Sequence, residues 1–422
     1  MIVTETAYSL DPTSLLDSLA GTENLLIIQD LDGVCMDLVR DPLSRTLEPA
    51  YLQAALALDG HFQVLTNGEH IGSRGVNGLV ERAIGARPHC QEQGLYLPGL
   101  AAGGVQVQDR HGRISHPGVS AAELAFLAAA PAHLSASLKT LLQQAPYNLP
   151  AHDADRLLAS SMLDNPLSPT LNLNAFHHHW HDQPALYARL QADGAKHLQA
   201  LLDRAAAQGL AQSFFVHYAP NLGRDADGHE RLRSAQGSAA GTTDMQLMLR
   251  GAVKEAGVLV LLNRHYGQRT GVYPLGETFN ARQAPTSLEA LRQLAVERFD
   301  PRHMPRLVGV GDTLTSSAVT SEAGDITWLR GGSDRGFLTL VQELGKAFGQ
   351  HNLVLYVDSS RGEVQRPGVD AGYLRDHPDD PWPALAGISD ANDPLRLSAI
   401  FADGPCQYIA FFRALAAARQ RG

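Results

Sequence analysis

Two acidic residues that follow a short apolar run are the first candidates for chemistry in this sequence. The run 25–28 predicts a strand buried on both faces, and Asp30, Asp32 and Gly33 follow it. Open α/β sheets bind ligands beyond the carboxyl ends of their strands, and residues i and i+2 point the same way. Two close carboxylates repel unless a cation lies between them, and hard cations such as Mg²⁺ take oxygen ligands. The alternative is a strand that ends in an ordinary acidic turn.

Residues 30–34, Asp-Leu-Asp-Gly-Val, resemble the first motif of the haloacid dehalogenase superfamily of phosphoryl-transfer enzymes. The resemblance implies that Asp30 is a nucleophile that attacks phosphorus and forms an aspartyl-phosphate. It implies that Asp32 serves as general acid and then as general base. Asp rather than Thr at the second position favours a phosphatase or mutase over a transport ATPase. The implied fold class is α/β, with a Rossmann-like parallel-sheet core and an inserted α+β cap.

A second apolar run, 61–65, ends at Thr66, Asn67 and Gly68, with Glu69 next. A Thr in this place resembles the superfamily's second motif, whose hydroxyl holds a phosphate oxygen. Asn67 and Gly68 add exposed amides at a helix start, which is a natural anion site. A simple turn is the alternative. We predict Thr66 as a catalytic residue and the three residues after it as substrate-binding residues.

A long helical pattern over 242–269 contains Lys254, one of four lysines in the chain. Lys254 resembles the superfamily's third motif, a lysine near the start of the helix that leads back into the core. The alternative is a solvated helix lysine.

The apolar run 307–311 ends in Gly-Asp at Asp312, which resembles the fourth motif. The resemblance implies that Asp312 binds Mg²⁺ together with Asp30 and the backbone carbonyl of Asp32. Many superfamily members carry a further Asp a few residues later, which this chain lacks. We expect Asp334, reached through a loop and placed near the substrate, to take that role, with Ser316 as the local alternative.

Between about 121 and 241 the composition changes to Ala- and Leu-rich helices, expected over 121–130, 132–144 and 184–208. This change predicts a core segment over 1–120, a cap over 121–241 and a second core segment over 242–422. A large cap between the second and third motifs resembles the subgroup in which sugar-phosphate phosphatases are frequent.

Residues in the predicted cap offer groups suited to sugar hydroxyls, and we predict Tyr218, Asn221 and Arg224 as substrate-binding residues. The histidine-rich run 177–181 suggests zinc, but adjacent histidines cannot all face one metal and the HExxH spacing is absent. We favour a surface loop or a sugar-stacking edge for this run.

Composition excludes several functional classes. The formal net charge is −10, which argues against a nucleic-acid partner. Three cysteines are too few for a disulfide scaffold and favour a cytoplasmic protein. Residues 1–7 lack the features of a signal peptide, and no apolar run approaches ~18 residues, so we expect no membrane span.

Longer stretches of the sequence resemble one particular family within this superfamily. The blocks that carry the resemblance are Ile-Gln-Asp-Leu-Asp-Gly-Val-Cys-Met, Leu-Thr-Asn-Gly-Glu-His, Phe-Phe-Val-His-Tyr-Ala-Pro-Asn-Leu-Gly-Arg-Asp and Gly-Gly-Ser-Asp-Arg. They resemble the family of glucosylglycerol-3-phosphate phosphatases, which implies removal of phosphate during synthesis of an osmolyte under salt stress. The cognate glucosylglycerol-phosphate synthase is then a candidate partner. The alternatives are another substrate such as sucrose phosphate, a phosphotransferase or mutase, and a non-catalytic sugar-phosphate-binding regulator.

Overall fold

The computed structural model describes residues 8–237, 239–320 and 324–421, and the N-terminal residues 1–7 discussed above lie outside this part. A sheet of eight strands forms the core, in the order β16-β15-β12-β1-β2-β3-β4-β5. The six strands from β16 to β3 are parallel, and β4 and β5 add an antiparallel edge. The bounds of the strands are β1 Leu25–Gln29, β2 Phe62–Leu65, β3 Gly99–Ala101, β4 Gln106–Gln108, β5 Ile114–Ser115, β12 Arg306–Gly311, β15 Leu353–Val357 and β16 Ala399–Phe401.

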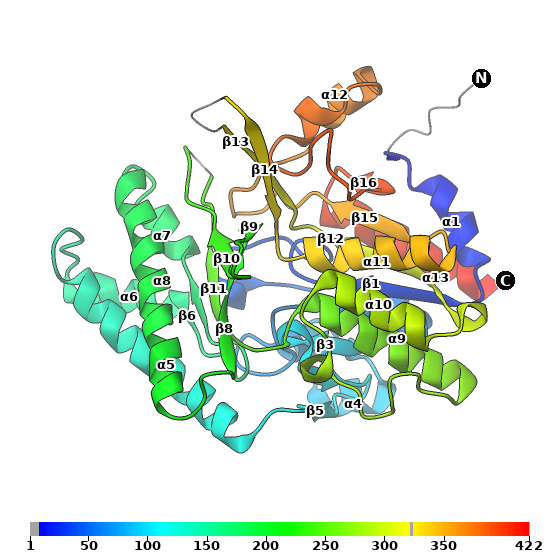
Figure 1. Ribbon diagram of the computed structural model, residues 1–422, viewed down its shortest axis with the longest axis horizontal. Coiled ribbons are helices and arrows are strands. Elements are labelled where there is room, and N and C mark those ends of the chain that lie inside the picture. The colour runs from blue at the N-terminus through cyan, green and yellow to red at the C-terminus, as the bar shows by residue number, and fades with distance from the viewer. Residues whose placement is uncertain (1–7, 238, 321–323, 422) are drawn as a thin grey trace.

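Helices cover both faces of this sheet, so alternate residues of β1 enter two different apolar layers. Leu26 and Ile28 pack with α9, α10 and α11, whereas Leu25 and Ile27 pack with α1, α2 and α13. Figure 1 shows the two layers on either side of the central strands. The bounds of the core helices are α1 Thr13–Ala20, α2 Pro49–Ala57, α3 Val76–Ile84, α4 Arg87–Gln93, α9 Lys254–Thr270, α10 Leu288–Arg298, α11 Arg335–Phe348, α12 Ala371–Asp376 and α13 Pro405–Arg421.

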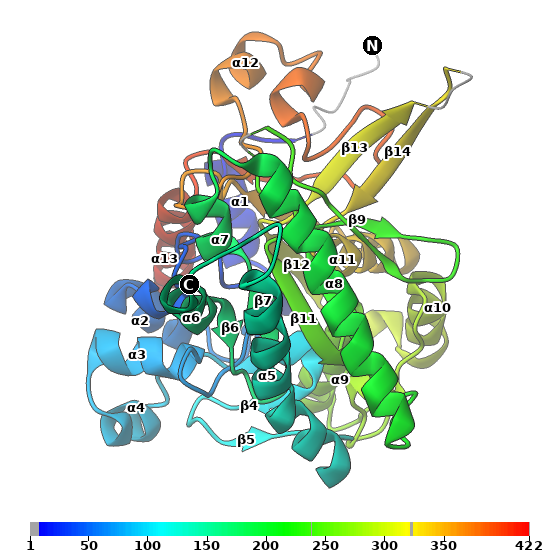
Figure 2. The ribbon, with the colours of Figure 1, turned by 90° about the vertical axis from the view of Figure 1, so that its left-hand side faces the viewer.

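A second, smaller sheet belongs to the inserted segment, which we call the cap. Its antiparallel strands lie in the order β6-β7-β11-β8, and α5 and α8 pack beside one another, with α8 against β8 and β11 (Figure 2). The bounds are β6 Met162–Leu163, β7 Thr170–Asn172, β8 Phe214–Ala219, β11 Asp244–Leu249, α5 Ala121–Leu142, α6 Ala151–Ser161, α7 Asn174–His179 and α8 Pro184–Ala207. The prediction of an α/β fold with a mainly parallel core sheet is confirmed.

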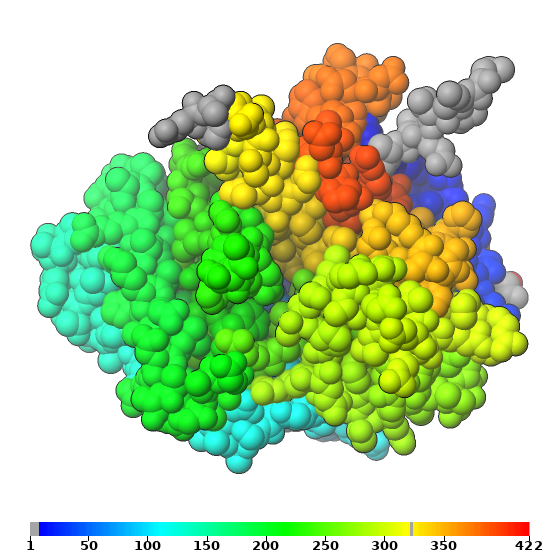
Figure 3. All heavy atoms as spheres, in the orientation of Figure 1, coloured from blue at the N-terminus to red at the C-terminus, as the bar shows by residue number. Residues whose placement is uncertain are grey.

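Two hairpins complete the described chain: β9 Asn221–Arg224 with β10 Glu230–Leu232, and β13 Thr315–Thr320 with β14 Ile326–Gly331. The space-filling view shows the cap, in cyan and green, meeting the core along a seam (Figure 3).

Two expected helices differ from the structure. The pattern over 242–269 is not one helix, because residues 244–249 form β11 and the helix begins only at Lys254. Five of the six residues of β11 are buried, and pairing with β7 and β8 on both sides overrides their helical spacing. β11 therefore lies in the cap sheet although it follows the predicted cap boundary at 241. The two helices expected over 121–144 are one helix, α5, which contains Pro131.

Helix α5 is the one helix of the described part that is long and apolar enough to cross a membrane by length and composition. Its Phe126, Leu127 and Leu134 are buried, and it packs against α6 and α8, as core helices with the same composition do. The three cysteines are unpaired.

Glu69, predicted as a substrate-binding residue, instead ties the cap to the core. Its carboxylate accepts the backbone N–H of Leu167 at 2.6 Å and both the N–H and the hydroxyl of Ser168 at 2.8 and 3.1 Å. The amide of Gln106 donates to its other oxygen at 3.1 Å. Glu69 is only 2% exposed, so these groups leave little room for a ligand.

We predict that Glu69→Ala lowers the free energy of unfolding by about 3 kcal/mol, because buried donors in the cap and in Gln106 lose their acceptor. Urea unfolding measures the change. Glu92→Ala, at an exposed glutamate, is the control and should change stability by less than about 0.5 kcal/mol. A loss no larger than that of the control would show that Glu69 does not hold the cap.

The same residue gives a pH test. Burial raises the pKa of Glu69 from its ordinary 4.5 to about 7, although the bonds from Leu167 and Ser168 oppose the shift. Between these two values the folded state binds the proton more tightly, so this residue makes stability fall as pH rises from about 4.5 to about 7. Glu69→Gln should flatten that fall, and parallel wild-type and variant profiles would contradict the assignment.

Candidate active site

Asp30 and Lys254 form a buried ion pair at the carboxyl end of the core sheet. Asp30 follows β1 directly, and its Oδ1 accepts the N–H of Leu31 at 2.8 Å. Its Oδ2 accepts a hydrogen bond from Lys254 Nζ at 2.6 Å. Lys254 is the first residue of α9 and is 3% exposed, so its position at the helix start aims the ammonium at the end of β1.

Lys254 also joins Asp334 to the site. Its Nζ lies 2.6 Å from Asp334 Oδ1, and Asp334 Oδ2 accepts the backbone N–H groups of Asp312 and Thr313 at 2.9 and 3.0 Å. Thr313 donates its hydroxyl to Asp312 Oδ1 at 2.9 Å, whereas Asp312 Oδ2 is buried and has no partner. Gly33 has φ +79°, and a Cβ there would collide with the Asp312 carboxylate, so the turn after β1 requires glycine.

The site holds more negative than positive charge. Asp30, Asp312 and Asp334 each offer a carboxylate oxygen, and these oxygens lie within 4.8 Å of one another. Burial, with Asp334 adding to it, raises the pKa of Asp30 to about 7 against the effect of Lys254. Burial and both neighbouring carboxylates raise the pKa of Asp312 well above its ordinary value. Oxygen ligands and unbalanced charge suit a hard divalent cation.

The structure distinguishes the two alternatives for the further acidic group. Asp334 lies in the carboxylate cluster, as the loop hypothesis expected. Ser316 donates its hydroxyl to Asp390 at 2.6 Å instead.

The predicted acid and base, Asp32, lies beside the predicted phosphate contact. Arg45 donates through Nη1 to both oxygens of Asp32, at 3.0 and 2.9 Å. Thr66 Oγ1 accepts the N–H of Gly68 at 3.2 Å. A Cβ on Gly68 would lie 3.6 Å from Thr66 Oγ1 and 3.9 Å from Asp32 Oδ2, so all three groups are neighbours.

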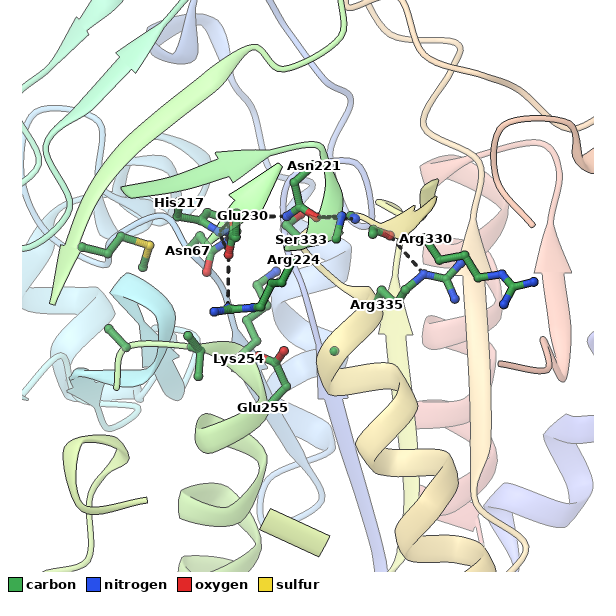
Figure 4. Close-up of a pocket in the computed structure, with 17 residues that line it drawn as sticks. Asn67, His217, Asn221, Arg224, Glu230, Lys254, Glu255, Arg330, Ser333 and Arg335 are labelled. Carbon is green, nitrogen blue, oxygen red and sulfur yellow. Dashed lines mark hydrogen bonds and ion pairs between the residues drawn. The ribbon is translucent and has the colours of Figure 1, made fainter. Parts of the chain in front are cut away.

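A cleft of about 160 Å³ lies between the cap and the starts of α9 and α11, and Asn67, Asn221, Arg224 and Lys254 are among its lining residues (Figure 4). Asn67 Nδ2 lies 2.8 Å from Nε2 of His217 on β8. This cleft brings the second motif, the third motif and the cap together.

The three predicted cap residues are held by Glu230. Glu230 accepts the N–H of Tyr218 at 2.9 Å, the amide of Asn221 at 3.2 Å and Nη2 of Arg224 at 3.2 Å. The Asn221 amide also donates to the Tyr218 carbonyl, and its oxygen accepts the N–H groups of Gly223 and Gly332, which occupies its hydrogen-bonding capacity. Arg224 keeps 45% of its side chain exposed and lines the cleft, and its Nη1 also donates to the Gly228 carbonyl at 3.2 Å.

The histidine-rich run lines a separate cleft of about 480 Å³, together with residues 362–365 of the core. His177 packs against Tyr187, with ring centroids 4.8 Å apart. Within the described ranges, neither group of residues able to hold a metal includes these histidines.

Sequence reasoning missed four residues near this site: Arg45 and Asp244, which lie close to Asp32, and Arg233 and Arg366, which line a neighbouring cleft with Asp312. Burial raises the pKa of Asp244, in the cap, to about 6, and the nearby Asp32 adds to this effect. Arg45 lies 13 residues beyond Asp32 in an irregular segment. No local pattern marks these residues, because their roles depend on contacts between the cap and the core.

Comparisons with known proteins fit this geometry. The model of the glucosylglycerol-phosphate phosphatase family matches residues 24–416. The chain is 50% identical to the glucosylglycerol-phosphate phosphatase of Synechocystis sp., over 100% of this chain and 99% of that protein.

Two solved structures were also matched. The trehalose-6-phosphate phosphatase C-terminal domain of C. albicans is 10% identical over 97% of this chain and 98% of its own, with a TM-score of 0.46. The enzyme of Aspergillus fumigatus is 11% identical over 97% and 99%, with a TM-score of 0.40. Scores this low carry no functional argument.

The family match and the relative span nearly the whole chain, including all the motifs around Asp30, Lys254 and Asp312. They confirm the resemblance found in the sequence blocks and the enzyme class, a phosphatase. The chain belongs to the glucosylglycerol-phosphate phosphatase family.

Proposed function

We propose that this protein hydrolyses glucosylglycerol 3-phosphate to glucosylglycerol and phosphate, with Mg²⁺ as cofactor and an aspartyl-phosphate intermediate. The observation that carries the mechanism is the cluster of Asp30, Asp312 and Asp334 around one lysine. The substrate follows from the family. The sugar phosphate is the small-molecule partner, and its product serves osmolyte synthesis.

The chain's own groups divide the work. A carboxylate oxygen of Asp30 attacks phosphorus, and Asp32 gives its proton to the departing alkoxide. Asp32 then takes a proton from water, which attacks the aspartyl-phosphate, so that phosphate leaves and Asp30 is restored. Lys254 and the Thr66 hydroxyl are placed to hold phosphate oxygens, and Arg45 orients the Asp32 carboxylate.

Asp30, Asp312 and the backbone carbonyl of Asp32 would hold the metal, which neutralises charge that develops on the phosphoryl group. The unpartnered Oδ2 of Asp312 and the raised pKa of Asp30 support this fit. Asp334 acts behind these ligands, because its oxygens already bind Lys254 and two backbone N–H groups.

We predict that Asp30→Asn lowers kcat for phosphate release by more than about a thousandfold, because the amide keeps the shape of the side chain but is a poor nucleophile. Thermal unfolding should show an intact fold, since the variant also removes a buried charge. A variant that retains a large part of the wild-type rate would exclude covalent catalysis by Asp30.

We predict that Mg²⁺ stabilises the wild-type protein by about 3 kcal/mol at a hundred times its Kd, and that Asp312→Asn abolishes this gain. In EDTA at pH 8 the variant should be at least as stable as the wild type, because a buried carboxylate with a raised pKa and one unpartnered oxygen is costly when charged.

Asp390→Asn is the matched control. Asp390 is buried but accepts hydrogen bonds from Ser316 and Arg330, so its variant should lose stability in EDTA and keep the Mg²⁺ gain. An equal Mg²⁺ gain in Asp312→Asn, or full activity of the wild type in EDTA, would refute the metal assignment.

We predict that Tyr218→Phe and Arg224→Ala lower kcat/KM for glucosylglycerol phosphate about tenfold or more, and that for p-nitrophenyl phosphate far less. The reason is that the reacting groups come from the core, whereas both residues belong to the cap: Arg224 lines the cleft, and Tyr218 follows the lining residue His217 on β8. Steady-state kinetics on both substrates measures the difference. Equal losses on both would show that these residues serve phosphate chemistry or folding.

A further inference from the structure

Two arginines line one small cleft at the junction of cap and core. Arg233 follows β10 in the cap, and Arg366 lies in the core segment after β15. Both line the cleft, which holds about 10 Å³, together with Thr313 and with Asp312 of the carboxylate cluster. Among the described residues, no carboxylate oxygen lies within 4.0 Å of a nitrogen of either guanidinium, so neither arginine forms an ion pair there.

Arg366 is incompletely satisfied in this position. Its Nη2 donates to Thr243 Oγ1 at a long 3.4 Å, and its buried Nε has no hydrogen-bond partner. An unpaired buried donor costs about 1–3 kcal/mol, and more on a charged group. Burial lowers the pKa of Arg366, an effect that the negative charges of Asp312 and then Asp244 oppose.

The second guanidinium makes the arrangement less favourable still. Burial lowers the pKa of Arg233, and the nearby charge of Arg366 lowers it further. Like charges in a partly buried cleft are costly unless an anion binds to both. Guanidinium groups donate pairs of N–H bonds that match the oxygens of phosphate.

We propose that Arg233 and Arg366 bind the phosphate group of the substrate, one from the cap and one from the core, beside Asp312. This inference rests on the proposed phosphatase reaction, which brings a phosphate dianion to Asp30, and Asp312 belongs both to that carboxylate cluster and to the lining of this cleft. The anion then links the two parts of the protein, so the cap closes most tightly when a phosphate ester is present. A site that recognised only the uncharged sugar hydroxyls would not need two cations beside the carboxylate cluster.

The test compares Arg233→Met and Arg366→Met with Arg231→Met, an exposed arginine two residues from Arg233. Inorganic phosphate with Mg²⁺ is the binding probe, followed by its effect on the melting temperature. We expect each variant of the pair to weaken phosphate binding about 10- to 100-fold, which corresponds to one or two charge-assisted hydrogen bonds. The control should bind phosphate as the wild type does.

Stability in phosphate-free buffer separates binding from a structural role. Arg233→Met relieves repulsion between like charges, so this variant should be no less stable than the control. Arg366→Met also removes a cation close to Asp312 and Asp244, so its phosphate affinity is judged against that of the charge-conserving Arg366→Lys. Arg366→Lys should recover part of the phosphate affinity, since it restores the charge without the planar fork.

Kinetics supply the second readout. The Arg233 and Arg366 variants should raise KM or lower kcat/KM to a similar extent for glucosylglycerol phosphate and for p-nitrophenyl phosphate. A loss confined to the sugar phosphate would overturn the proposal, because it would make the pair readers of the leaving group. Unchanged phosphate affinity in both variants would overturn it as well. A wild-type protein that hydrolyses neither ester would refute the proposed function itself, whatever the arginine variants bind.

Discussion

The ammonium group of Lys254 between Asp30 and Asp334 is the interaction on which the site depends. It lies 2.6 Å from an oxygen of each, and all three side chains are nearly inaccessible to water. Burying one cation with two carboxylates is tolerable only when further hydrogen bonds satisfy the remaining oxygens. The N–H groups of Leu31, Asp312 and Thr313 do so, which explains why three separate chain segments must end at the same edge of the sheet.

The lysine does not balance the site completely. Asp312 adds a third carboxylate with an unpartnered oxygen, so the protein alone carries a surplus of buried negative charge there. Such a surplus weakens a fold unless a ligand uses it. A divalent cation would balance that surplus, and the negative charge of a bound phosphate would then require further cations. Arg233 and Arg366, which line a cleft with Asp312, are the candidates for that role.

Polar contacts help to hold the cap on the core, in addition to an apolar cluster that contains residues of both. Glu69 receives backbone donors from the cap, Asn67 contacts His217, and Arg366 reaches Thr243. Each of these core residues lies close to a residue with a role in the proposed reaction: Asn67 and Glu69 follow Thr66 in the chain, and Arg366 lines a cleft with Asp312. The position of the cap and the geometry at phosphorus are therefore coupled through short connections.

The sequence by itself determined the core strands before Asp30 and Asp312 and singled out Lys254, because each rests on a local pattern: a buried apolar run that ends in an acidic residue, or a helical segment that carries one of four lysines. It also determined the family through long blocks around these residues. Tertiary structure decided what no local pattern encodes. It made residues 244–249 a cap strand, bound the Glu69 carboxylate to donors of the cap, and placed Asp334, not Ser316, in the carboxylate cluster. It also brought Arg45 to Asp32, and Arg233 and Arg366 to a cleft lined by Asp312, since long-range pairing and burial place side chains that lie far apart in the chain.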